Sequence, residues 1–295
     1  MNLEPLLYWC RERENIRLKK EAGEPWPWTS DPILQKFSFC NLRREDDRIT
    51  RWIDQHIRKP FAHSPYLWWM LAASRQINWD PTLAELIAKR AWPTEPDFTT
   101  NQVTIVLEAR SARGEKWQTG AYMIRAENNQ NVPWVKWSKA RYIAEIVLGS
   151  LWADRPRFVA IFAAQPTMAE VHSMLSEYRG WGPFLSYQVC VDMRFTRLLE
   201  NAPDREMWAV AGPGTVRGLN RLLGRPIKAR LSQEEALEHM LQIYPVLKAE
   251  FPAIDLSDVP NSACEVDKYL RVKCGEGRPR ARYLNYLLSS PSEVR

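Results

Sequence analysis

Six consecutive charged residues, Arg43 to Arg48, are the side chains of this sequence best suited to bind a polyanion. In a helix, Arg44, Asp47 and Arg48 would lie three or four residues apart and line one stripe. Arginines on such a stripe could bind phosphate, and a carboxylate beside them could stand near a reacting group. The alternative is a solvated face held by salt bridges. Asn41, Arg43, Arg44, Asp47 and Arg48 are therefore candidates for supporting a binding pocket.

Two glycines around a tryptophan form the second candidate, in the stretch YRGWGPFLSYQVCVDMR. Proline favours the first position of a helix, so Pro183 predicts a helix ending near 178, a tight turn, and a second helix to about 199. Glycines let the backbone approach an anion, and amides at a helix N-terminus carry partial positive charge. Gly180 and Gly182 are therefore candidates for phosphate binding, with an ordinary interhelical turn as the alternative.

Gly212-Pro213-Gly214 repeats this pattern at the start of another predicted helix, which also carries Arg217. Gly212, Gly214 and Arg217 could form a second phosphate cradle for the same physical reason. A simple turn between helices is again the alternative.

Helical signals dominate the elements that must position these residues. Capping boxes at Thr167 and Ser232, each with a glutamate three residues later, mark two helix starts. Alternating strand patterns are nearly absent, so the predicted class is all-α. We expect one enzyme unit over 1–295, with two possible lobes, about 1–115 and 116–295, around a cleft. The predicted helices are about 3–21, 43–58, 66–77, 80–90, 99–112, 138–152, 167–178, 183–199 and 232–250.

Composition narrows the class of protein. The chain has 295 residues, a net charge of +6 and 14 tryptophans, which is compatible with nucleic-acid binding without requiring it. Its five cysteines and four histidines lack ligand spacing, so we expect neither disulfides nor a metal, and no cofactor. No apolar run reaches the ~20 residues that cross a bilayer, which predicts a cytoplasmic protein without a membrane partner.

The predicted hairpin resembles that of the helix-hairpin-helix DNA glycosylases, whose catalytic aspartate stands roughly twenty residues beyond it. Asp204 lies at about that distance from Gly182. Asp192 lies earlier, in VDMR, which looks like the Val-Asp-Thr-His-Val-x-Arg motif of the same enzymes. Either aspartate could instead be structural, as an N-cap or an arginine's partner. Phe184 stands where lyase-type members carry a lysine, so the resemblance does not imply a Schiff base.

Longer motifs resemble the α-glutamyl/putrescinyl-thymine pyrophosphorylase-like family, related to those glycosylases. This family includes phage enzymes that hypermodify thymine and bacterial anti-phage glycosylases that act on glucosylated hydroxymethylcytosine. The resemblance covers nearly the whole chain and implies a DNA-base enzyme. The motifs are ILQKFSFCNLRREDDRITRWI (33–53), TGAYMIRA (119–126), WGPFLSYQVCVDMRFTRLLENAPDREMWAVAGPGTVRGLNRLLGR (181–225) and CEVDKYLRVKCGEGRPRARY (264–283).

We therefore expect a monofunctional DNA glycosylase that flips a modified base out of double-stranded phage DNA and excises it in anti-phage defence. Asp204 or Asp192 would stabilise the cation-like sugar. One alternative is a transferase that displaces pyrophosphate from activated hydroxymethyl-uracil with an amine, and another is a DNA-binding protein without catalysis. No obligatory protein partner is expected. Further base-pocket or support candidates are Tyr122, Trp181, Gln188 and Arg194.

Overall fold

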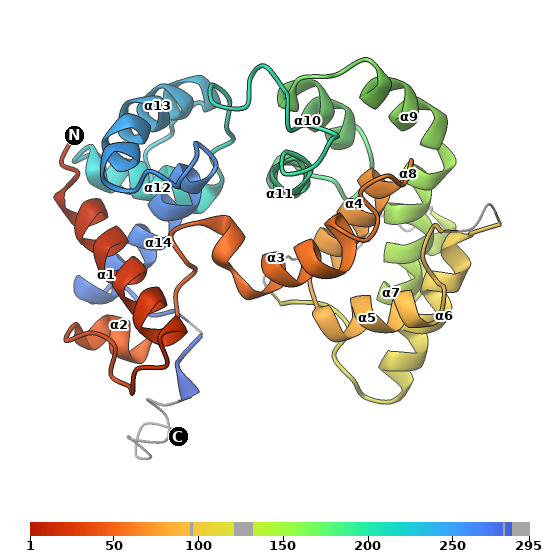
Figure 1. The fold of residues 1–295 in the computed structure, drawn as a ribbon, viewed down its shortest axis with the longest axis horizontal. Helices are drawn as coiled ribbons and strands as arrows, with labels where there is room; N and C mark the ends of the chain where they lie inside the picture. Colours follow the sequence, from red (N-terminus) through yellow and green to blue (C-terminus); the bar gives the residue numbers. More distant parts are fainter. Residues whose placement is uncertain (95–96, 121–131, 280, 285–295) are drawn as a thin grey trace. The chain divides into compact units, whose positions relative to one another are not determined.

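The structure is a computed structural model that describes residues 1–94, 97–120, 132–279 and 281–284 (Figure 1). Within these ranges every regular element is helical, and the only pairing of extended backbone is an isolated bridge between Phe37 and Arg282. The predicted all-α class is thus confirmed, whereas a glycosylase-like arrangement of the whole chain stays a prediction. No described helix combines the length and apolar character that spanning a bilayer requires.

The chain divides into two compact units, and the division is discontinuous in sequence. Unit 1 comprises residues 1–47 and 209–295, and unit 2 comprises residues 48–208. This differs from lobes that meet near residue 115, because the chain leaves unit 1 after Asp47 and returns to it at Ala209. Contacts between the first 47 residues and the last part of the chain carry no local sequence signal.

The longest helices of unit 1 are α1 (Glu4–Glu21), α13 (Gln233–Glu250) and α14 (Asp258–Lys273). Asp31 links three of its helices, since its carboxylate accepts hydrogen bonds from Tyr8, from Tyr269 and from the first amides of α2. Burial and the nearby Asp31 carboxylate raise the pKa of Tyr8 to about 12. The elements are α1 (Glu4–Glu21), α2 (Pro32–Lys36), the 3-10 helix η1 (Arg44–Asp46), α12 (Pro213–Leu222), α13 (Gln233–Glu250) and α14 (Asp258–Lys273).

Glycines let α12 and α14 approach each other unusually closely. A Cβ atom on Gly214 would lie 2.3 Å from the Cys264 sulfur, and one on Gly218 would lie 1.9 Å from the Ala263 carbonyl oxygen. A side chain at position 218 would therefore push the helices apart, and one at position 214 would displace the side chain of Cys264. The two helices form the structural centre of unit 1.

Four of the chain's 14 tryptophans are buried in unit 2. All residues of α4 are buried, and its Trp68 stacks on Phe158 with ring centroids 4.1 Å apart. Trp69 makes edge contacts with Trp92 and Phe98. These buried tryptophans are thus used for core packing. The elements are α3 (Arg48–Ile53), the π-helix η2 (Asp54–Arg58), α4 (Leu67–Ile77), α5 (Asp80–Ala88), α6 (Thr100–Ala112), the 3-10 helix η3 (Pro133–Lys136), α7 (Lys139–Arg141), the π-helix η4 (Tyr142–Leu148), α8 (Gly149–Ala153), α9 (Arg155–Ala163), α10 (Met168–Ser176) and α11 (Pro183–Met193).

The predicted helix starts agree with the structure where a cap marks them. Both capping boxes form, at Thr167 for α10 and at Ser232 for α13. The continuous helix predicted over 43–58 is wrong, because η1, α3 and η2 follow one another there with an extended residue at Asp47. The helix predicted to reach 199 ends at Met193. Charge spacing thus located the segment but not its breaks.

Candidate functional site

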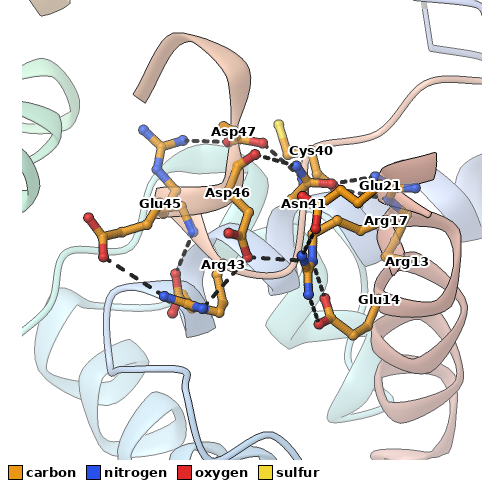
Figure 2. A network of polar contacts seen from close by, with 12 residues as sticks. Arg13, Glu14, Arg17, Glu21, Cys40, Asn41, Arg43, Glu45, Asp46 and Asp47 are labelled. Atoms are coloured by element: carbon orange, nitrogen blue, oxygen red, sulfur yellow. Dashed lines mark hydrogen bonds and ion pairs between the residues drawn. The ribbon is translucent and has the colours of Figure 1, made fainter. Parts of the chain in front are cut away.

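The loop formed by residues 40–47 is the candidate site of unit 1, and α1 holds it from one side (Figure 2). Arg13 is buried and donates to the carbonyl oxygen of Cys40 at 3.1 Å and to Oδ1 of Asn41 at 2.8 Å. Asn41 Nδ2 donates to the carbonyl of Asp46, and the Asn41 amide donates to Oδ1 of Asp47. Asn41 is therefore the internal clamp of the loop.

α14 holds the same loop from another side with three polar residues on one stripe. Asp258 accepts the amide of Arg44 at 2.8 Å, and Glu265 accepts the amide of Cys40 at 3.2 Å. Asn261 Nδ2 donates to the carbonyl of Asn41 at 3.3 Å. Spacings of three and four residues place these side chains on one helix face. That spacing was the signal by which they could have been found from the sequence.

The charged side chains of the loop surround one another at ion-pair distances. Arg43 lies 3.8 Å from Glu45 and 3.9 Å from Asp46, and Arg17 of α1 lies 3.6 Å from Asp46 (Figure 2). These distances exceed a charge-assisted hydrogen bond, so Arg43 is positioned mainly by charge. A partly exposed guanidinium on an anchored backbone can bind a phosphate or another anion.

Arg48, the last residue of the charged run, belongs to unit 2. Its guanidinium binds both carboxylate oxygens of Asp80 at the start of α5. This hydrogen bond lowers the pKa of Asp80, against the opposing effect of burial. The structure thus brings Asn41, Arg43, Arg44 and Asp47 together in unit 1 and gives Arg48 a different partner.

Asp204 caps a helix. One carboxylate oxygen accepts the amide of Met168 at 2.8 Å, and the other accepts the amide of Ala169 at 2.9 Å. These are the first amides of α10, so the carboxylate satisfies a helix N-terminus that is distant in sequence. Asp204 therefore has the structural role of a helix cap, but the helix that it caps is α10 and not one that begins at Asp204.

Asp192 is fully buried and held by Arg75 of α4. The Arg75 Nη2 atom lies 2.6 Å from Asp192 Oδ1, and Nε contacts the other oxygen. Arg75 also donates to the hydroxyl of Thr50 at 2.9 Å. A buried bidentate pair of this kind ties α11 to α4. Asp192 therefore takes the role of an arginine's partner, with Arg75 in place of a neighbour on its own helix.

The predicted hairpin between α10 and α11 forms, and its three central residues have different roles. Gly180 has φ +83°, and a Cβ there would meet Val147 at 2.7 Å. Trp181 is buried and donates to the Val147 carbonyl at 3.0 Å, which makes it a core residue. Gly182 is the N-cap of α11, with open space where a Cβ would be. Only Gly182 thus offers backbone that a ligand could approach.

The second glycine turn is used for packing. Gly212 is the N-cap of α12, but Gly214 faces α14. Arg217 donates from Nε to the buried carboxylate of Asp267 at 2.9 Å. Asp267 is thus the partner of Arg217. It lies within the motif at 264–283 but was not among the predicted site residues.

The remaining candidates are placed as follows. Gln188 is a buried residue of α11, and Arg194 is the buried C-cap residue of the same helix. The guanidinium carbon of Arg194 lies 4.6 Å from the ring centre of Phe195. Tyr122 lies outside the described residues. In the part of the chain that the structure describes, no three His, Cys, Asp or Glu side chains are grouped as a metal site would need.

Comparison with known proteins assigns this chain to a class. It belongs to the family described as the helical domain of 5-hmdU DNA kinase, which matches residues 2–278. A curated protein of Bacillus phage SP10, named 5-hmdU DNA kinase, is 23% identical over an alignment of 293 residues, which covers 93% of this chain and 44% of the phage protein. The chain thus spans less than half the length of that relative. No solved structure matches.

These findings correct the expected activity. The matches support a relation to phage proteins that modify thymine or uracil in DNA. They do not support membership of the pyrophosphorylase or glycosylase family itself. The predicted glycosylase, a hydrolase that excises a flipped base in anti-phage defence, is wrong, because both matches are described as a DNA kinase. A kinase transfers a phosphoryl group and leaves the N-glycosidic bond intact. Asp192 and Asp204 therefore lose their proposed part in excision.

A kinase needs a nucleotide as phosphoryl donor and usually Mg²⁺. The sequence has no G-x-x-x-x-G-K-[ST] run, which would cradle nucleotide phosphates. The residues of this chain therefore do not fit a P-loop nucleotide site.

Proposed function

We propose that this chain is a DNA-binding helical domain that recognises 5-hydroxymethyl-deoxyuridine and presents its hydroxymethyl group for phosphorylation. The observation that carries this proposal is the family match over residues 2–278. The name of the phage relative supports the choice of base. The domain would bind the nucleic-acid substrate, and the phosphoryl donor would be bound elsewhere.

The chemistry of the base fits a domain that binds duplex DNA. The C5 substituent of thymine points into the major groove, which is wide enough for an α-helix. A hydroxymethyl group at the same carbon is exposed there too, so phosphorylation does not require that the base leave the stack. The features that support phosphate contact are the open backbone at Gly182 and the guanidinium of Arg43.

Binding to matched duplexes tests the proposal. The chain is titrated onto labelled duplexes that differ only in thymine or 5-hydroxymethyl-uracil, and fluorescence anisotropy gives the two Kd values. We expect tighter binding to the modified duplex by about tenfold, which corresponds to roughly 1.4 kcal/mol. Equal affinity for the two duplexes, or no binding to either, would contradict the proposal. Mass spectrometry of the nucleosides after incubation with ATP reports whether the chain also catalyses phosphorylation by itself.

The transferase alternative acts on the same base and is therefore kept as a second candidate. Its specific support is the modified uracil named in the phage relative, because displacement of pyrophosphate begins from an activated hydroxymethyl-uracil. Arg43 and Arg44 would then stabilise the leaving group. Duplex DNA carrying the pyrophosphorylated base separates the two functions: release of pyrophosphate with an amine joined to the base indicates transfer, and unchanged DNA excludes it.

A further inference from the structure

Three arginines of unit 1 converge on one carboxylate that is fully buried, Asp267. Arg217 and Arg221 of α12 each place Nε 2.9 Å from a different oxygen of Asp267. Arg271 of α14 places its Nε 3.6 Å from the same carboxylate. Arg217 and Arg221 are four residues apart on α12, and Asp267 and Arg271 are four residues apart on α14. Each pair therefore lies on one face of its helix, and the two faces meet at the carboxylate. We call Arg217, Arg221 and Arg271 the arginine trio.

The contacts with Asp267 use the Nε side of each guanidinium. The two Nη atoms form the other edge of the planar fork, which matches two oxygens of a phosphate. Arg217 and Arg271 have 37% and 33% of their side chains exposed, and within the described residues Asp267 is the one ion-pair partner of each. Arg221 is more buried and uses Nη2 for Glu276. Arg217 and Arg271 can therefore accept a further anion.

The charges around the trio leave a positive balance. Three guanidinium groups face two carboxylates, those of Asp267 and Glu276. Lys268 on the same helix pairs with Glu265, which belongs to the stripe that holds the loop 40–47. Burial raises the pKa of the nearby Cys264 thiol, so that group stays neutral. The trio is thus a cationic site with a deficit of one negative charge.

Close helix packing holds the trio in place. Gly214 and Gly218 fix the separation of α12 and α14, from which all three arginines extend. Arg217 Nη2 lies 3.7 Å from the point where a Gly214 Cβ would be, so this guanidinium stands beside the first turn of α12. The backbone there carries partial positive charge, which adds to the attraction for an anion. Preorganised donors lose little entropy when a ligand binds.

We propose that the arginine trio binds a phosphate group, with Arg217 and Arg271 as the direct ligands and Arg221 and Asp267 as the residues that position them. The inference rests on the proposed function for the source of that phosphate, which is the DNA backbone. A free compound such as pyrophosphate offers the same chemistry, and the experiment distinguishes the two sources.

The test compares the double variant Arg217→Gln/Arg271→Gln with Arg11→Gln. Arg11 is a matched control, because it is an exposed arginine of unit 1 that binds a carboxylate, Glu250. Binding of a labelled duplex is measured by anisotropy over a range of KCl concentrations. We expect the double variant to bind about tenfold more weakly, since it loses the charge-assisted hydrogen bonds of two guanidinium groups to phosphate. The negative slope of log K against log salt should become shallower by about one, and the control should match the parent.

Two further variants separate the loss of a phosphate ligand from a loss of folded structure. Thermal unfolding shows whether the double variant is folded, and Arg271→Gln alone removes the arginine with the longest contact to Asp267, so it disturbs packing least. The lysine pair Arg217→Lys/Arg271→Lys keeps the charge but not the fork, and an intermediate affinity is expected. If all of these folded variants bind the duplex as the parent does, the trio does not bind DNA phosphate.

Inorganic pyrophosphate, titrated by calorimetry, supplies the second arm. Loss of pyrophosphate binding in the double variant with unchanged DNA binding identifies a free phosphate compound as the ligand and keeps the site. If the parent binds no DNA but binds pyrophosphate through the trio, the proposed function fails while the site stands. If folded variants bind both ligands as the parent does, or if the parent binds neither, the inference is overturned.

Discussion

At the scale of single residues, the carboxylates that looked reactive in the sequence are occupied by structural partners. Both oxygens of Asp204 accept helix amides, and both oxygens of Asp192 contact Arg75. These contacts give the two carboxylates structural roles, Asp204 as a helix cap and Asp192 as the partner of an arginine. In unit 1, Asn41 likewise uses its side chain internally, since it holds Arg13 and the carbonyl of Asp46.

The first prediction concerns this clamp. Asn41→Leu keeps a similar volume but leaves Nη2 of the buried Arg13 guanidinium without its acceptor, so the free energy of unfolding should fall by about 1–3 kcal/mol. Urea denaturation followed by circular dichroism measures the change. Asn201→Leu, at an exposed position of unit 2, is the control and should change stability much less. An equal effect of both substitutions would show that Asn41 does not clamp the loop.

At the scale of elements, glycines decide how closely helices meet and where backbone is open. Gly214 and Gly218 belong to a packed helix pair, whereas Gly182 has open space beside it at the start of α11. The same residue type thus has two different roles. Which role applies depends on the neighbouring helix, which local sequence does not specify.

Substitution in the packed pair should be costly. In Gly218→Ala the new methyl group would lie 1.9 Å from the Ala263 carbonyl oxygen, so α12 and α14 must separate. We expect a loss of about 1–3 kcal/mol in the free energy of unfolding, measured in urea. Gly182→Ala, which meets nothing within 4 Å, is the matched control and should leave stability nearly unchanged. A stable Gly218→Ala variant would mean that the helices tolerate a wider separation.

The hairpin gives a second prediction at this scale. Gly182→Val should weaken binding to duplex DNA several-fold without loss of stability, because the side chain blocks approach to the backbone while its Cβ meets no protein atom within 4 Å. Gly180→Val should instead destabilise the protein, since its φ of +83° and the contact with Val147 exclude a side chain. Anisotropy and thermal melting are measured together on both variants. Unchanged DNA affinity in Gly182→Val would remove the hairpin from the proposed interface.

Glu85 links α5 to α6 and predicts an acid-sensitive contact. It binds Arg110 on α6 and also Lys89 and Arg113, which are the C-cap residues of α5 and α6. The hydrogen bond with Lys89 is the largest cause that lowers the pKa of Glu85 to about 2. Because the folded pKa lies below the ordinary value of 4.5, the stabilisation is complete above pH 4.5 and is lost as pH falls towards 2.

Glu85→Gln should therefore be less stable than the parent at neutral pH, and the difference should shrink between pH 4.5 and 2. Urea midpoints at a series of pH values measure this convergence. Glu238→Gln, at an exposed position of α13, is the control. A difference that stays constant over the whole range would show that the ionised carboxylate is not the stabilising form.

At the scale of the whole molecule, two units share the features that could meet a nucleic acid. The candidate loop and the arginine trio belong to unit 1, and the hairpin belongs to unit 2. The family match extends over both units, from residue 2 to residue 278. A net charge of +6 over the full sequence favours association with a polyanion.

Salt dependence is the prediction for the whole molecule. If several arginines contact phosphate, log K for duplex DNA should fall linearly with log salt at a slope of about −0.9 for each contact, and we expect a slope steeper than about −3. Titrations from low to high KCl give the slope. An affinity that does not change with salt would rule out phosphate contacts as the basis of binding.

The sequence by itself determined the helical class, both capping boxes and the hairpin turn, because these depend on residues close together in the chain. It also located the charged loop, but not the helix breaks within it. Only the tertiary structure decided that Asp204 caps α10, that Arg75 holds Asp192, and that Asp258 and Glu265 anchor the loop. These partners lie far apart in sequence, and their pairing follows from which helix faces are buried together. For the same reason, the sequence indicated phosphate-binding glycines at 212–214, and the structure packs Gly214 against α14.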